Sequence, residues 1–292
     1  MNSLKFDCLI IGAGPSGITG GIYLQNAKIN VAIVEKSAPS SKIATLNEIN
    51  NYLGEKSIKG IDLAMKFQEQ LFSANIPYIS DEVIDIKEHQ EHFEVVTNTT
   101  SYLSKYVLIS TGIINKKLGI LNEDKFFGQG ISYCSVCDGA LYKDKVIALA
   151  GKTINNDLKY LQPIAKTIHV FGKKQKNHDN VIFHEEEITE FLGKFFLQQI
   201  KTSKEIIDVD GCFINNGVIP GTSFLKNLNE KYPGLLSDKG FINVDSNYET
   251  NIKKIYAVGD AINYPVKQIS FASGTACAAS HNIISSIKKE TK

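Results

Sequence analysis

The residues of this sequence with the clearest chemistry are two cysteines and an acid in one short stretch. Cys134 and Cys137 are separated by two residues, and Asp138 follows the second cysteine directly. Cysteines at this spacing can close a small disulfide loop. A dithiol that reduces another disulfide needs a low-pKa thiolate and a proton source for the leaving sulfur. Asp138 could supply or relay that proton if its pKa is raised, so the stretch is interpreted as a redox dithiol.

The cysteine pair has two other interpretations, half of a zinc site or two incidental cysteines in a turn. A zinc site would need a second pair of ligands. The remaining cysteines are single residues far apart in the sequence: Cys8, Cys212 and Cys277. We therefore favour redox chemistry and expect no metal, and this choice depends on the motifs that flank the pair.

Composition limits the class of protein. The chain has 292 residues, enough for two domains with a well-buried core. Its net charge of +1 argues against a general nucleic-acid-binding role, and no segment approaches the roughly 20 apolar residues of a membrane span. No secretory signal is recognised at the N-terminus, where a short apolar run leads into a glycine motif. Five cysteines are too few for a disulfide scaffold, so we expect a reducing cytoplasm and one cycling disulfide.

A nucleotide-binding motif opens the sequence. Leu4–Ile11 is typical of a buried parallel strand, and a second such run, Val31–Val34, ends at Glu35. Between them a helical pattern follows a GxGxxG turn, which consists of Gly12, Ala13, Gly14, Pro15, Ser16 and Gly17. Glycines in such a turn allow a tight bend, approach of the backbone to a pyrophosphate, and close packing of helix on strand. Glu35 is expected to accept hydrogen bonds from a ribose.

Two later strands end in residues suited to ligand binding. Tyr106–Ser110 is followed by Thr111-Gly112, and Ile255–Val258 is followed by Gly259-Asp260. Ligands of parallel sheets bind at the carboxyl ends of the strands. A helix rich in small residues is predicted from Ser270 onward, and its N-terminal end could approach a flat ligand.

A second strand–helix–strand frame lies in the middle of the chain. Its strands are predicted at Val146–Ala150 and Ile168–Phe171. Only one glycine, Gly151, stands in the turn after the first strand, so a phosphate cradle is not evident. The basic segment 172–176 follows the second strand; it could meet a 2′-phosphate, but it has no arginine and is interpreted as a solvated turn.

Several of these motifs fall in the order and spacing of one family. They are Gly12–Gly17, Thr111-Gly112, Cys134–Asp138, Gly259-Asp260 and the run from Gln268 to Ala279. The chain resembles the low-molecular-weight flavin thioredoxin reductases over essentially its whole length. The resemblance implies an α/β fold with two Rossmann-like, three-layer domains of the dinucleotide-binding type. It also implies a homodimer, an FAD domain at 1–113 and 246–292, and an inserted, smaller NADPH-domain-like module at 114–245 that carries the cysteines.

The resemblance also implies roles for individual residues. Cys137 matches the cysteine next to the flavin, Cys134 the thiol that attacks thioredoxin, and Asp138 the acid. Asp260 matches a residue at the ribityl-phosphate region of FAD, and Asn51 matches one near the flavin ring. The residues expected to bind FAD are Gly12, Ala13, Gly14, Pro15, Ser16, Gly17, Glu35, Lys36, Lys42, Asn51, Val83, Thr111, Gly112, Gly259, Asp260, Gln268 and Ile269.

The sequence departs from the family pattern in two places. Ser40-Ser41-Lys42 stands where the family usually has Gly-Gly-Gln, which changes the residue at a flavin contact. In the inserted module, Ala150-Gly151-Lys152 replaces the second glycine motif, and 171–175 replaces a His-Arg-Arg motif. Loss of both predicts poor NADPH binding. This pattern is similar to the ferredoxin-dependent flavin thioredoxin reductases, which keep the dithiol and FAD but take electrons from reduced ferredoxin.

Three functions remain open. In the first, which we expect, a flavin-dependent oxidoreductase in the cytoplasm reduces thioredoxin with electrons passed from ferredoxin through FAD. In the second, NADPH or NADH is the donor and binds through Gly151 and nearby lysines. The third is a non-catalytic flavin-binding interaction or sensor protein, and the presence of both cysteines and Asp138 argues against it. Neither nucleic acid nor a membrane is expected as a partner.

Overall fold

The computed structural model describes residues 5–46, 48–172 and 179–290. It divides into two compact units. The first consists of Met1–Ala44, Ile61–Ile114 and Pro220–Lys292, and the second of Thr45–Gly60 and Asn115–Ile219. Most of the basic segment 172–176, from 173 onward, lies outside the described residues. None of the described helices is both long and apolar enough to cross a membrane.

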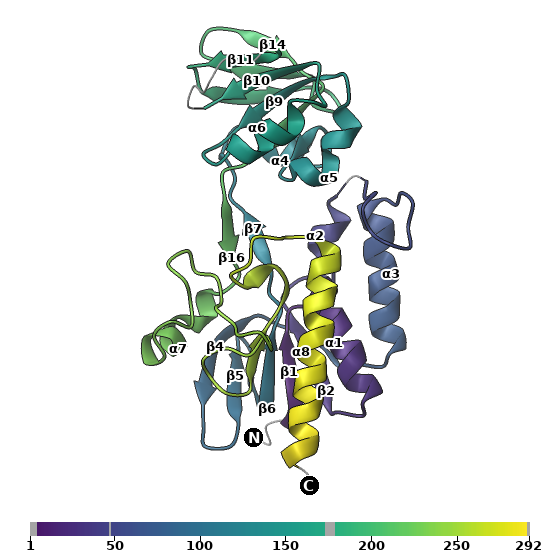
Figure 1. Ribbon diagram of the computed structural model, residues 1–292, viewed down its shortest axis with the longest axis vertical. Helices are drawn as coiled ribbons and strands as arrows, with labels where there is room; N and C mark the ends of the chain where they lie inside the picture. The colour runs from purple at the N-terminus through teal and green to yellow at the C-terminus, as the bar shows by residue number, and fades with distance from the viewer. Residues whose placement is uncertain (1–4, 47, 173–178, 291–292) are drawn as a thin grey trace. The chain divides into compact units, whose positions relative to one another are not determined.

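A seven-stranded sheet forms the centre of the first unit (Figure 1). Its strands are β1 (Lys5–Ile11), β2 (Val31–Glu35), β3 (Tyr78–Ser80), β4 (Val83–Glu88), β5 (Phe93–Thr97), β6 (Ser101–Ile109) and β17 (Ile255–Ala257). The order is β3-β2-β1-β6-β5-β4, and β17 also pairs with β6. Strands β3, β2, β1, β6 and β17 run parallel, whereas β5 is antiparallel to both of its neighbours, β6 and β4. Residues 8–11 and 31–34 are buried on both faces, which explains their continuous apolar runs.

The helices of the first unit cover this sheet. They are α1 (Pro15–Asn26), α2 (Ser41–Ala44), α3 (Gly60–Ser73), α7 (Lys226–Lys231) and α8 (Ile269–Glu290), with the 3-10 turns η2 (Ser223–Leu225) and η3 (Gly259–Ala261). Figure 1 shows α1 and α8 side by side. Glycine allows this close packing, because a Cβ added at Gly20 would lie 2.7 Å from Leu108 and 3.4 Å from Ser280.

The second unit is built on a five-stranded parallel sheet with the order β11-β10-β9-β15-β8. Its strands are β8 (Ile131–Ser132), β9 (Val146–Ala150), β10 (Thr167–Phe171), β11 (Val181–His184) and β15 (Gly211–Ile214). An antiparallel sheet packs with it, formed by β12 (Ile188–Leu192), β13 (Gln199–Thr202) and β14 (Ile206–Asp208). The helices are α4 (Glu123–Phe126), α5 (Ser135–Asp138) and α6 (Asn155–Leu161), and the 3-10 turn η1 is Gly139–Tyr142. The α/β architecture predicted from the sequence is confirmed.

The chain crosses between the units on two short strands, β7 (Ile113–Asn115) and β16 (Val218–Pro220), which pair with each other. Residues 113–129 connect β6 to the cysteine segment and contain β7 and α4. Glu123 orders this connection, because its buried carboxylate accepts the backbone N–H groups of Leu118, Gly119 and Ile120. Glutamate side chains are normally exposed, but the buried Glu123 carboxylate holds the backbone of this segment in place through these hydrogen bonds.

Candidate redox and cofactor site

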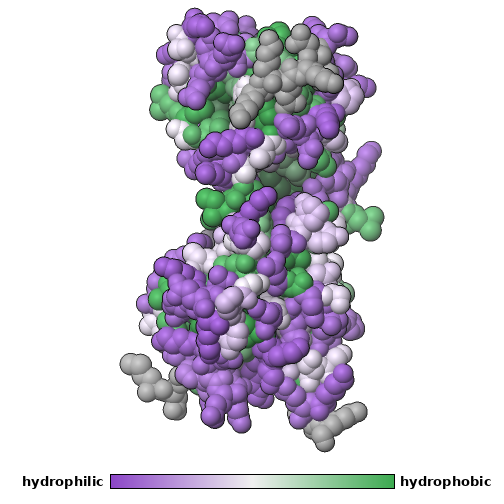
Figure 2. Space-filling model, turned by 60° about the vertical axis from the view of Figure 1, so that its left-hand side comes forward, coloured by the Kyte–Doolittle hydropathy of each residue, from purple (hydrophilic) through white to green (hydrophobic). Residues whose placement is uncertain are grey.

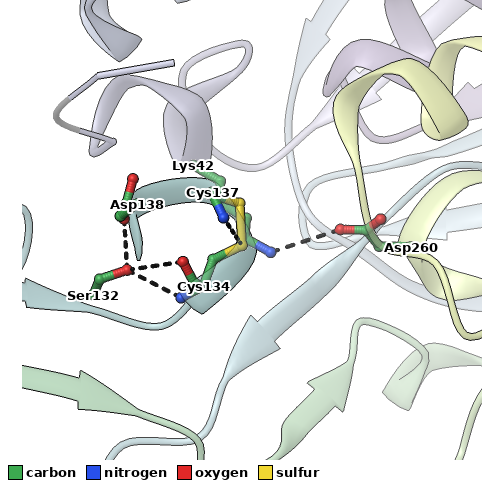
Figure 3. The surroundings of a disulfide bond; sticks show 6 residues. All are labelled: Lys42, Ser132, Cys134, Cys137, Asp138 and Asp260. Carbon is green, nitrogen blue, oxygen red and sulfur yellow. Dashed lines mark hydrogen bonds and ion pairs between the residues drawn. A yellow bond between two sulfur atoms is a disulfide. The ribbon is translucent and has the colours of Figure 1, made fainter. Parts of the chain in front are cut away.

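The two cysteines form a disulfide at the start of α5. Their Cα atoms are 5.3 Å apart, and the bond joins Cys134 to Cys137. Cys134 is the N-cap of the helix, and its sulfur accepts the backbone N–H of Cys137 at 3.2 Å (Figure 3). A sulfur at a helix N-terminus is stabilised as a thiolate by the adjacent N–H groups. The redox interpretation of this stretch is consistent with this geometry.

Asp138 lies beside the disulfide and is buried. The Ser132 hydroxyl donates to Asp138 Oδ2 at 2.5 Å and accepts the backbone N–H of Cys134 at 3.0 Å (Figure 3). Asp138 Oδ1 is buried and meets no hydrogen-bond partner in the described part of the chain. Burial raises the pKa of the Asp138 carboxyl, and the hydrogen bond from Ser132 opposes part of that rise. A carboxyl with a raised pKa holds its proton to a higher pH than an ordinary aspartate, which suits it to the role of a proton donor.

A second acid supports the backbone on the other side of Cys134. The Tyr133 hydroxyl donates to Glu123 Oε1 at 2.6 Å, so the residue before Cys134 is tied to the carboxylate that holds 118–120. Burial and this acceptor both raise the pKa of the Tyr133 phenol, which keeps it protonated as the donor. Sequence reasoning missed Ser132 and Glu123, because no motif marks either residue.

The glycine turn after β1 has the geometry that nucleotide binding requires. Gly12 has φ +106°, and a Cβ there would lie 2.6 Å from the Ser110 carbonyl oxygen. A Cβ at Gly17 would lie 1.9 Å from the Gly12 carbonyl oxygen, which fixes the close packing of α1. At Gly14 an added Cβ would meet no described atom within 4 Å, so the backbone is open to a ligand there. The three glycines thus have three different physical roles.

Glu35 reaches this turn from the end of β2. Its Oε2 accepts the backbone N–H of Ala13 at 2.8 Å, and its Oε1 accepts the N–H and hydroxyl of Ser37. The structure therefore brings Glu35 to the glycine turn, although Ala13 and Glu35 are 22 residues apart in the sequence. The carboxylate is placed where a ribose of a nucleotide bound to the turn would meet it.

A second cluster of charged groups surrounds η3. Lys42 Nζ lies 3.8 Å from Asp260 Oδ2, and Lys267 Nζ donates to the Asp260 carbonyl at 2.9 Å (Figure 3 shows the Lys42 pair). Asp260 Oδ1 is buried with no partner among the described residues. Burial raises the pKa of the Asp260 carboxyl, while Lys42 and Lys267 oppose the rise. No sequence motif marks Lys267, which lies in the loop that precedes α8.

The neighbouring turn after β6 is also prepared for a ligand. The Thr111 hydroxyl is buried and has no hydrogen-bond partner in the described ranges. Gly112 has φ +67°, and a Cβ there would meet nothing described within 4 Å. Gly259 N–H is satisfied by the Thr275 hydroxyl of α8, and a Cβ at Gly259 would lie 2.7 Å from Ser16 Oγ. The starts of α1 and α8 therefore meet at this point, which brings the turns after β1 and β17 together.

The remaining residues expected to bind FAD lie in different settings, and their roles stay predictions. Val83 begins β4 and is buried, Lys36 forms an ion pair with Glu82 on the surface, and Ile269 begins α8 directly after Gln268. Asn51 belongs to the segment that clusters with the second unit.

The second strand–helix–strand frame differs from the first at its turn. A Cβ at Gly151 would lie 2.2 Å from the Asn215 carbonyl oxygen, so this glycine allows a tight turn. The Thr153 N–H and hydroxyl both bond to Asn215, and Asn215 Nδ2 donates to Asp157 Oδ2 at 2.5 Å. The turn is thus closed by its own hydrogen bonds, and a carboxylate lies in the first turn of α6. Both features oppose a phosphate at this position.

Comparison with known proteins identifies the class. The sequence matches the family described as "Pyridine nucleotide-disulphide oxidoreductase" over residues 6–155 and 153–276. The chain belongs to this family, and it is an oxidoreductase that acts on a disulfide. It is 33% identical to the thioredoxin reductase of Ureaplasma parvum over 303 residues, covering 96% of each chain. The chain therefore also belongs to the thioredoxin reductases.

Solved structures agree with this assignment. A thioredoxin reductase from Streptococcus pyogenes superposes with a TM-score of 0.92 at 28% identity, covering 99% of this chain and 100% of the other. A ferredoxin-flavin thioredoxin reductase from Clostridium acetobutylicum gives a TM-score of 0.57 at 27% identity, covering 99% and 100%. The fold of two dinucleotide-binding-type domains is confirmed.

FAD is the cofactor of this family, and the residues present fit it. The open backbone at Gly14 suits a pyrophosphate, and Glu35 suits a ribose. The buried, unpaired oxygens of Thr111 and Asp260 are polar atoms that the described protein leaves unsatisfied, and a polar ligand would satisfy them. The prediction of FAD as cofactor is confirmed, whereas the contact made by each residue stays a prediction.

Proposed function

We propose that this chain reduces the disulfide of thioredoxin through Cys134 and Cys137. The observation that carries the proposal is the buried Asp138, whose pKa is raised by burial, beside a disulfide at the start of α5. When bound and reduced, FAD would supply the two electrons that convert the disulfide, with uptake of one proton, to a thiolate at Cys134 and a thiol at Cys137. The family assignment and the relatives named thioredoxin reductase support the same substrate.

The residues of the chain carry out the exchange that follows. The Cys134 thiolate attacks one sulfur of the thioredoxin disulfide, which forms a mixed disulfide and releases the other sulfur as a thiolate. Asp138 gives its proton to that leaving sulfur, while Ser132 holds the carboxyl by its hydrogen bond. Cys137 then attacks the Cys134 sulfur and passes its proton to the second thioredoxin sulfur, which leaves, so that reduced thioredoxin is released and the Cys134–Cys137 disulfide is restored.

Single-cysteine variants test these roles and the enzyme itself. Cys137→Ser keeps the attacking thiol, so it should form a stable mixed disulfide with a thioredoxin that retains only the cysteine under attack, activated as a disulfide with a small thiol, and Cys134→Ser should not. Such a partner has no second thiol to reverse the exchange, and non-reducing gel electrophoresis measures the product directly. If only Cys134→Ser traps thioredoxin, Cys137 is the cysteine that attacks thioredoxin and Cys134 is the one that resolves the mixed disulfide. Trapping by neither variant would favour a non-catalytic flavin-binding protein.

We propose reduced ferredoxin as the electron donor. The turn after β9 supports this proposal. Asn215 accepts the Thr153 hydroxyl, and the Asp157 carboxylate lies in the first turn of α6, where a nucleotide phosphate would need hydrogen-bond donors. The driving force is sufficient. A plant-type ferredoxin at about −400 mV and thioredoxin at about −270 mV differ by roughly 6 kcal/mol for two electrons. The ferredoxin-flavin thioredoxin reductase from Clostridium acetobutylicum offers a structural parallel.

NADPH or NADH is the second candidate donor. It is favoured by the family description and by the high structural similarity to the Streptococcus pyogenes thioredoxin reductase. Stopped-flow reduction of the bound flavin separates the candidates on one preparation of protein. We expect rapid bleaching with reduced ferredoxin and none within seconds at micromolar NADPH or NADH. Bleaching by micromolar NADPH would overturn the ferredoxin assignment and leave the thioredoxin assignment intact.

The proposal also includes a homodimer in the cytoplasm. Cys8 and Cys212 are buried free thiols, which suits a reducing compartment. Sedimentation equilibrium of the FAD-loaded protein tests the dimer, and a monomer at micromolar concentration would exclude it.

A further inference from the structure

Two phenylalanines are exposed at the tip of one hairpin of the second unit. Phe195 is 73% exposed and Phe196 61% exposed, in the turn between β12 and β13. The turn is tight, because the Gln198 N–H bonds to the Leu192 carbonyl and a Cβ at Gly193 would lie 2.0 Å from the Phe196 carbonyl oxygen. Two large apolar side chains in water contribute little to folding, so their exposure needs another explanation.

The hairpin packs directly on the segment that leads to the disulfide. Leu197 is buried in a core cluster with Phe126 and Ile131, and its N–H bonds to the Gln129 carbonyl at 2.8 Å. A Cβ at Gly130 would lie 2.6 Å from Leu197 Cβ. The tip is therefore fixed to the residues just before Cys134, within the same compact unit.

The separation of tip and disulfide suits one docked protein. Four residues lead from Gly130 to Cys134 and can span at most about 14 Å, and Phe195 lies two residues beyond the Leu197 contact. The tip thus lies within about 25 Å of the disulfide. A standard interface buries about 800 Å² on each partner, which is roughly 28 Å across. One small protein can cover both.

Two lysines lie beside the aromatic tip. Lys194 Nζ lies 5.4 Å from the Phe195 ring centroid, and Lys125 Nζ donates to the Gly193 carbonyl at 3.1 Å. The acids nearby in the chain are paired, Asp124 with Lys117 and Glu190 with Lys201. Figure 2 shows apolar residues interrupting a mostly hydrophilic face of the molecule. The tip is therefore an apolar point with positive charge beside it.

We propose that Phe195 and Phe196 form a docking surface for the protein whose disulfide Cys134 attacks. Its partner is a small disulfide-bearing protein with an apolar area and acidic side chains near its own disulfide. The inference rests on the proposed function, because it names a recognition surface for the same substrate. The substrate is favoured over the electron donor as occupant, since the tip belongs to the unit that carries the cysteines.

A steady-state comparison tests the surface. The double variant Phe195→Ser/Phe196→Ser should raise the KM for thioredoxin about 10-fold or more, because exposed aromatic anchors are the residues that dominate interface affinity. The kcat and the rate of flavin reduction by the electron donor should stay within about twofold of the wild-type values. The matched control is Ile182→Ser on β11, which removes a 47% exposed side chain from the same unit and should leave KM unchanged.

Charge reversal gives a second test. Lys194→Glu should raise KM several-fold at low salt, and the difference from wild type should shrink at about 1 M salt, where the screening length is about 3 Å. An unchanged KM in the double variant would overturn the inference. Slower flavin reduction with unchanged KM would assign the surface to the electron donor instead. A changed oligomeric state would assign it to a second copy of the chain.

The wild-type protein separates failure of this inference from failure of the proposed function. If wild type reduces thioredoxin and the double variant does so with the same KM, only the docking surface is wrong. If wild type reduces no thioredoxin with any donor, the proposed function is wrong and the docking surface falls with it.

Discussion

Asp138→Asn is the sharpest test of the acid beside the disulfide. Asparagine keeps the size of the side chain and can still accept the Ser132 hydroxyl, which donates to Asp138 Oδ2 at 2.5 Å. It cannot give up a proton. The variant therefore removes the proton transfer and leaves the geometry around Cys134 nearly unchanged.

The expected loss follows from the chemistry of the leaving group. Proton transfer by a positioned side chain contributes about 10²- to 10⁴-fold to a rate. The leaving thiolate of thioredoxin has a pKa near 7, so it needs less help than an alkoxide would. We therefore expect the lower end, a loss of about 100-fold in thiol–disulfide exchange, equal to about 2.7 kcal/mol in the barrier. Flavin content and flavin reduction by the donor should be within about twofold of wild type.

Rapid mixing of pre-reduced protein with oxidised thioredoxin measures the exchange rate across pH. Because burial raises the pKa of Asp138, the wild-type carboxyl holds its proton to a higher pH than an ordinary aspartate. Its contribution should decline as pH rises through that pKa, whereas the variant should lack this step. Equal rates and equal pH profiles for variant and wild type would refute the role of Asp138 as the acid.

The same variant has a predicted effect on stability. The unfolded carboxyl ionises near pH 3.9 and the folded carboxyl at a higher pH, so ionisation favours unfolding. The cost of ionising Asp138 to the free energy of folding is absent below the pKa of the unfolded state. It grows as pH rises from that pKa to the higher pKa of the folded state, and it is complete above the latter. Each unit of difference corresponds to about 1.4 kcal/mol. Asp138→Asn should therefore raise Tm at pH 8 and leave it unchanged near pH 3.

Three further variants test the supporting structure. Gly17→Ala places a Cβ 1.9 Å from the Gly12 carbonyl oxygen, so it should destabilise the protein by about 3 kcal/mol. The purified variant should also lack the flavin absorbance band, and normal flavin content would contradict the packing argument. Asp260→Asn should raise the Kd for FAD about 10-fold in a fluorescence titration of apoprotein, and an unchanged Kd would show that the buried oxygen has another role. Glu123→Gln should cost about 2–3 kcal/mol in denaturant unfolding, because an amide cannot accept all four hydrogen bonds. Its control is Asp124→Asn, an exposed neighbour expected to change stability by less than about 0.5 kcal/mol, and equal effects of the two would contradict the prediction.

Sequence patterns predicted those strands whose burial can be recognised from the apolar residues within the strand itself. The strand at Val146–Ala150 has the predicted bounds, because a continuous run of apolar residues marks a strand that is buried on both faces. The predicted strand at Tyr106–Ser110 is longer in the structure and begins at Ser101, where pairing with β5 extends it. Such an extension depends on a partner strand and leaves no signal in the segment itself.

The site shows the same division. The spacing of residues was enough to predict the disulfide and the glycine turn, because the residues that form each of them lie within a few positions of one another in the sequence. The contacts that tune them join distant residues, such as Lys42 with Asp260. A lysine in the place of a family glutamine gave no indication of an ion pair, since the pair exists only when α2 and η3 are brought to the same edge of the sheet.

The sequence by itself determined that this protein has a dinucleotide-binding turn, an adjacent acid at Glu35 and a redox-type cysteine pair. Each of these needs only local geometry and a fixed order along the chain. Tertiary structure decided that Asp138 is buried against Ser132 and that the Asn215–Asp157 pair closes the second turn. It also decided that Phe195 and Phe196 remain in water while Leu197 is buried. Burial and pairing depend on which distant segments pack together, and no single stretch of sequence specifies that.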